Sequence, residues 1–197
     1  MNWKTVVSVI ILAGLATFIP ITKSVSHVLK WGTIPTELYT LGVIDENKFP
    51  DVKELVGPID LKTNPRAVLN TLWAFGLANK NAILEMGPMS ANTASYASTG
   101  GWTLAAGTAM DHYSMHELVK LNPDQQKIVE RVSKNVYRPC CKNPAYFPDC
   151  NHGMAMLALL QLAAGEDWSE QEMYALAKEA NAVWFPPRPI DGCGTQT

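Results

Sequence analysis

The chain has 197 residues, which is enough for one domain with a substantial hydrophobic core and short terminal extensions. Hydrophobic residues make up 47% of it and charged residues 17%, the composition of a folded protein rather than a disordered one. The net charge is −2 and the 16 basic residues are scattered, so the basic patch that nucleic-acid binding requires is missing. We therefore expect no nucleic-acid partner.

The N-terminal segment is typical of an export signal or a membrane anchor. Lys4 precedes an uncharged, mostly apolar run over residues 5–22, close to the roughly 20 residues needed to span hydrocarbon. Ser24 and Ser26 place small residues at a suitable spacing for cleavage before His27. We predict a signal peptide or anchor over residues 1–26, which would place the rest of the chain outside the cytoplasm, tethered to a membrane. A buried N-terminal helix is the alternative.

The next segment, residues 27–63, is interrupted by Pro35, Pro50 and Pro58, and we expect an extended linker with short pieces of structure. A helical domain is predicted over residues 64–187. Its first helix has Asn64 and Pro65 as the capping residue and first helical residue. A Gly/Ser-rich loop around Trp102 follows.

Three further helices are predicted near the C-terminal end. The first starts at Asn122 and Pro123 with a capping box, the second starts near Asn151, and the third starts at Ser169 with an S-x-x-E capping box. Residues 188–197 form a tail. Since no alternating strand pattern occurs, we predict an all-α fold that ends in a small antiparallel three-helix bundle with a Cys-rich loop at one end.

That loop carries a pattern of metal-ligating residues, Cys140, Cys141, Cys150 and His152. Three thiolates and an imidazole form the Cys3His set used for zinc, and thiolates also suit Cu(I) and iron–sulfur clusters. The motif FPDCNH resembles the end of mitoNEET-type iron–sulfur loops, although that family has C-x-C and a histidine four residues after its last cysteine. The resemblance implies a cluster, and the residues predict a metal ion or iron–sulfur cluster containing copper, zinc or iron.

Two other interpretations of the same cysteines stay open. Four cysteines, with Cys193 as the fourth, could form two structural disulfides in an exported protein. Alternatively, residues 122–187 resemble the periplasmic thiol-oxidoreductase subunit of cytochrome c maturation, through the cysteine pair, PDCNH, GEDWSEQEM and AVWFPP. That family has C-x-x-C where this chain has adjacent cysteines. The resemblance implies thiol–disulfide exchange. Because an oxidised adjacent pair is strained and easily reduced, Cys150 could act as the resolving thiol.

A second group of candidate ligands lies in MDHYSMHEL. His112 and His116 are four residues apart and would share one face if the segment is helical, so they are possible additional ligands if the fold brings them to the cysteine loop. Asp111 and Asp149 are candidates for orienting a histidine from behind.

Signatures of other enzymes, such as G-x-S-x-G, a phosphate-binding glycine loop or C-x-x-C-H, do not occur. The sequence therefore favours an exported metal- or cluster-binding protein, with a possible protein partner, over an enzyme. If the protein is an enzyme, we expect a thiol–disulfide oxidoreductase.

Overall fold

The computed structural model describes residues 28–186. Within this range the chain folds into six α-helices and three short 3-10 helices, with isolated β-bridges and no strand. The elements are α1 (Ile34–Thr40), η1 (Pro50–Glu54), α2 (Pro65–Ala78), α3 (Ala82–Met86), η2 (Thr93–Ser95), η3 (Ala109–Asp111), α4 (Pro123–Asn135), α5 (Asn151–Gly165) and α6 (Glu170–Trp184). The predicted all-α fold is confirmed.

The predicted signal or anchor at residues 1–26 and the tail at 188–197 lie outside the described residues. Among residues 28–186, none of the helices combines the length and the apolar character needed to cross a bilayer. The signal or anchor stays a prediction.

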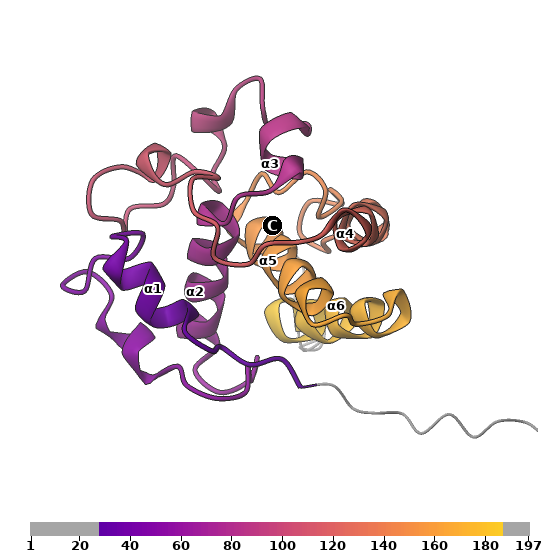
Figure 1. The fold of residues 1–197 in the computed structure, drawn as a ribbon, viewed down its shortest axis with the longest axis horizontal. Coiled ribbons are helices and arrows are strands. Elements are labelled where there is room, and N and C mark those ends of the chain that lie inside the picture. Colours follow the sequence, from indigo (N-terminus) through magenta and orange to yellow (C-terminus); the bar gives the residue numbers. More distant parts are fainter. Residues whose placement is uncertain (1–27, 187–197) are drawn as a thin grey trace, which may run out of the picture.

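Helix α5 occupies the centre of the fold. All of its residues from Gly153 to Ala164 are buried, because a helix that is apolar on every face must be covered on every face. Helix α2 lies along one side of it, and α4 and α6 lie along the other (Figure 1). The α2–α5 contact is close enough to require a glycine, since a Cβ at Gly76 would overlap the carbonyl oxygen of Met154.

Helices α4, α5 and α6 contact one another pairwise at the C-terminal end of the chain. The capping boxes predicted at Asn122 and Ser169 are both formed, and each side chain accepts a hydrogen bond from the first turn of its helix. Helix α5 begins at Asn151, as predicted. The main difference from the sequence expectation is that α5 also makes an extensive contact with α2, so it belongs to more than a three-helix bundle.

Residues 27–63, predicted to form an extended linker, pack into the core over their described part. Trp31, Leu38, Val43 and Val52 are at most 1% exposed, and α1 and η1 both contact α2. Two of the three prolines that suggested a linker lie in the first turns of α1 and η1, where proline starts a helix instead of breaking one.

The Gly/Ser-rich segment around Trp102 is a loop as predicted, and it is anchored at Trp102 and at Ser98. Trp102 is buried, donates a hydrogen bond from Nε1 to the carbonyl of Val43 at 3.0 Å, and packs edge-on against Trp73 with 4.9 Å between ring centroids. Four residues before Trp102, the backbone N–H of Ser98 bonds the carbonyl of Asp149 at 3.1 Å. This bond fastens the loop to the cysteine-rich segment.

Candidate metal centre

The chain makes a tight turn between α4 and α5 that places two cysteines at its tip. Tyr137 and Pro144 form a β-bridge, and inside it the N–H of Arg138 bonds the carbonyl of Asn143 at 3.1 Å. Lys142 adopts a left-handed conformation with φ of 59°, and its N–H bonds the carbonyl of Arg138 at 2.9 Å. This reversal makes room for both adjacent cysteines on the same side of the loop.

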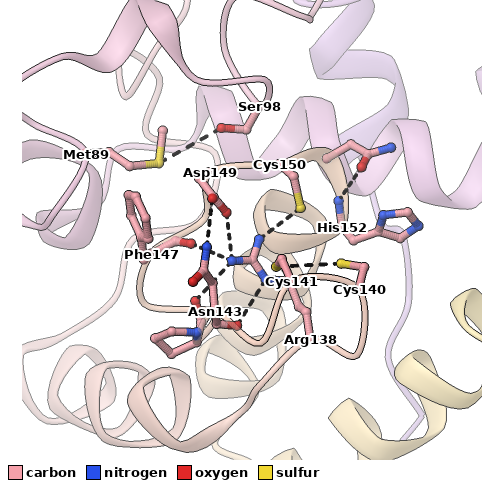
Figure 2. Close-up of polar contacts among 12 residues, drawn as sticks. Met89, Ser98, Arg138, Cys140, Cys141, Asn143, Phe147, Asp149, Cys150 and His152 are labelled. Carbon is pink, nitrogen blue, oxygen red and sulfur yellow. Dashed lines mark hydrogen bonds and ion pairs between the residues drawn. The ribbon is translucent and has the colours of Figure 1, made fainter.

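Three thiol groups converge at this turn (Figure 2). The Sγ atoms of Cys140, Cys141 and Cys150 all lie within 4.8 Å of one another, and those of Cys140 and Cys141 are 3.7 Å apart. All three cysteines are free, two of them exposed and Cys150 half-buried. Two thiolates bound to one tetrahedral ion at about 2.3 Å lie about 3.8 Å apart, so the three sulfurs lie close enough to hold a metal ion.

A buried arginine lies directly beneath the thiols. Arg138 is 1% exposed, and its guanidinium donates hydrogen bonds from Nη1 to Cys150 Sγ at 2.9 Å and from Nη2 to Asp149 Oδ1 at 2.8 Å. Nη2 also bonds the carbonyl of Phe147 at 2.8 Å, and Nε bonds that of Asn143 at 3.2 Å. The arginine therefore fixes the whole loop around its own planar set of donors.

Glycine at position 153 makes this burial possible. Gly153 lies in the first turn of α5, and a Cβ there would overlap Nη1 of Arg138 and lie 2.7 Å from its Cζ. The guanidinium thus occupies the space beside the helix backbone that a side chain at position 153 would fill.

Burial and neighbouring thiols raise the pKa of Cys140 to about 11. Removal from water is the larger cause, and the hydrogen bond with Cys141 and the charges of the other two sulfurs act in the same direction. In the metal-free protein Cys140 is therefore a protonated thiol at neutral pH. A bound cation would reverse the effect, because it stabilises the thiolate form of every sulfur that it contacts.

His152, predicted as the fourth ligand, is not part of the converging group among residues 28–186. Its ring points away from the sulfurs in Figure 2 and packs against Phe185 and Trp184, with centroids 4.6 and 5.8 Å away. Burial, and to a smaller extent the charge of Arg138, lowers the pKa of His152. The imidazole is uncharged at neutral pH, but its role as a ligand stays a prediction.

The predicted partner residues have different neighbours from those expected. Asp149 was expected to orient a histidine, yet its carboxylate pairs with Arg138 and accepts a bond from Asn143 Nδ2 at 2.8 Å. Asp111 completes a capping box with Thr108 at η3. The Asp111 carboxylate accepts a hydrogen bond from the backbone N–H of Thr108 at 2.8 Å.

The two other predicted ligands, His112 and His116, face each other, with Nδ1 of the first 3.2 Å from Nε2 of the second. The short η3 ends at Asp111, so the two histidines do not share a helix face, and the turn that follows η3 brings their rings together. They do not join the thiol group.

Sequence reasoning did not single out Arg138 or Gly153. The only signal was an arginine two residues before the cysteine pair, and arginine in such a position is ordinarily solvated. Its burial follows from the loop's five backbone and side-chain acceptors, which only the folded chain brings together.

No protein-family model, curated protein or solved structure matches this chain. The resemblances to the thiol-oxidoreductase subunit and to the mitoNEET-type loop therefore stay predictions.

Proposed function

We propose that this protein binds a single thiophilic metal ion, Zn²⁺ or Cu⁺, through the thiolates of Cys140, Cys141 and Cys150. The observation that carries the proposal is the convergence of the three sulfurs, with a Cys140–Cys141 separation of 3.7 Å that matches the spacing of two thiolates on one ion. Both ions accept sulfur ligands readily.

A single ion fits the donor set better than an iron–sulfur cluster. Clusters are held by four protein ligands, whereas the described residues offer three thiols around one point. The guanidinium of Arg138 supplies positive charge beside Cys150 Sγ, which offsets part of the negative charge that three thiolates bring together.

The exposure of Cys140 and Cys141 leaves one side of the ion accessible. Structural zinc sites are closed by four protein ligands, and sites with an open position admit water or an incoming ligand. An open thiolate site therefore suits a protein that exchanges its ion with a partner. With the predicted signal or anchor, this exchange would take place on the outer face of a membrane.

The test is metal content and thiol protection in protein purified without air. We expect about one equivalent of Zn²⁺ or Cu⁺ per chain, and three thiols that react with a maleimide only after chelation. Cys141→Ser and Cys150→Ser should each lose most of the metal, and Cys193→Ser, as the matched control, should keep it. Metal retained by both of the first two variants, or lost equally in Cys193→Ser, would refute the proposal.

Thiol–disulfide exchange is the second candidate, and the position of Cys150 within reach of both exposed thiols favours it. In that reaction a substrate disulfide gains two electrons and two protons, and two of the three cysteines lose them as they join. Exchange uses two of the three converging thiols, whereas a bound ion accounts for all three, so we rank exchange below metal binding. Catalysed reduction of a disulfide peptide by metal-free protein would reverse that order.

A further inference from the structure

The His112–His116 pair is a second cluster of metal-ligating groups in another part of the fold. The backbone of His116 pairs with the end of α2, through its N–H to the carbonyl of Ala78 at 3.0 Å and its carbonyl to the N–H of Lys80 at 2.8 Å. The thiols lie instead in the segment between α4 and α5, and the group that they form includes neither histidine.

The hydrogen bonds of His112 determine which of its ring nitrogens carries the proton and which carries the lone pair. Nε2 of His112 lies 3.2 Å from the carbonyl oxygen of Ala106, and because a carbonyl only accepts, Nε2 carries the proton. In the neutral ring the lone pair is then on Nδ1, which faces Nε2 of His116 at 3.2 Å. An N–H bonded to a backbone carbonyl behind the ring is the arrangement that orients metal-binding histidines in proteins.

The spacing of the two facing nitrogens suits one ion. Nitrogens 3.2 Å apart that each bind an ion at about 2.0–2.1 Å subtend an angle of roughly 100°, close to tetrahedral. To bind it, His116 needs only to carry its proton on Nδ1 instead of Nε2, so two neutral rings hold the ion with no proton lost from the protein.

The pair is held in place before any ion arrives. His112 is 7% exposed. Its ring packs over Gly42, since a Cβ added at Gly42 would lie 3.8 Å from His112 Cε1. Ser114, between the histidines, has φ of 55°, and this left-handed residue turns the second imidazole back toward the first. His116 is half-buried, so one side of the pair is open to solvent.

We propose that His112 Nδ1 and His116 Nε2 bind a borderline divalent metal ion, Zn²⁺ or Cu²⁺, at a site separate from the thiols. Imidazole nitrogens prefer these ions. Within residues 28–186 no carboxylate or thiol completes a three-ligand group with the pair, so water or a ligand from outside the described residues occupies the remaining positions. This site does not depend on the thiol site.

The experiment uses full-length protein with Cys140, Cys141 and Cys150 replaced by serine, so that metal bound through these thiols cannot contribute. We expect one equivalent of Cu²⁺ to bind with electron paramagnetic resonance splitting from two imidazole nitrogens. His116→Ala in this background should weaken binding at least about tenfold and remove one nitrogen coupling, and the control His27→Ala should do neither. Unchanged binding in His116→Ala would overturn the proposal.

A second measurement keeps the test valid if His116→Ala does not fold. Adding Zn²⁺ to the triple-serine protein should shift the side-chain nitrogen resonances of His112 and His116, with Nε2 of His112 remaining protonated. Shifts confined to His27 or His152, or no shifts at all, would refute the site. Either result leaves the thiol proposal standing, because the thiol site is tested by separate cysteine variants.

Discussion

Replacing Arg138 by methionine tests whether the buried guanidinium holds the cysteine loop together. Methionine is similar in length and apolar, so the change removes the charge and the donors while keeping much of the packing. The carboxylate of Asp149 would lose its 2.8 Å ion pair, and Phe147 O and Cys150 Sγ would lose donors at 2.8 and 2.9 Å.

The expected cost is large because these groups are not freely hydrated. Breaking a buried ion pair by removing one partner costs about 3–5 kcal/mol. The side chain of Asp149 is 24% exposed and keeps its bond from Asn143, so some hydration offsets the loss and we expect about 3 kcal/mol. For a chain of this size that lowers Tm by roughly 6–12 °C.

The assay is urea unfolding of the metal-free protein followed by circular dichroism. The matched control is Arg131→Met, which removes the exposed pair of Arg131 Nε with Glu170 Oε1 at 3.0 Å, and exposed pairs contribute about 0–1 kcal/mol. Adding Asp149→Leu to Arg138→Met should recover part of the loss, because it removes the unpaired carboxylate. Equal, small effects of the two arginine variants would refute the assigned role of Arg138.

Two further predictions follow from residues near the core. Gly153→Ala should destabilise the protein by about 1–3 kcal/mol through overlap with Arg138 and weaken metal binding. A Cβ in Gly165→Ala, at the other end of α5, would meet two side-chain methyl groups, Val119 Cγ1 at 3.0 Å and Leu121 Cδ2 at 3.9 Å. This variant should cost less, and equal costs in urea unfolding would contradict the packing argument. Burial raises the pKa of Tyr113 to about 12 from its ordinary 10.0. The neutral phenol is therefore favoured by folding, and this stability, fully present below pH 10, is lost as pH rises through about 12. Absorbance titration at alkaline pH should show this late step and its loss in Tyr113→Phe, and the absence of a late step would contradict the burial argument.

Local patterns in the sequence were sufficient for the C-terminal helices and their starting residues. Asn122 and Ser169 cap α4 and α6 as their motifs predict, because capping depends on residues within one turn. Helix α5 likewise begins at Asn151, near the predicted residue. The three clustered cysteines could be identified as a candidate site from their spacing alone, since residues 140–150 belong to one short loop.

Only the tertiary structure decided which donors converge and what supports them. Whether the cysteine side chains point to one place depends on the left-handed turn at Lys142 and on the burial of Arg138, and the latter requires Gly153 on another element. The orientation of His152 toward α6 and the pairing of His112 with His116 follow from packing between distant segments. Contacts of this kind depend on residues far apart in the chain, and no local pattern in a single sequence records them.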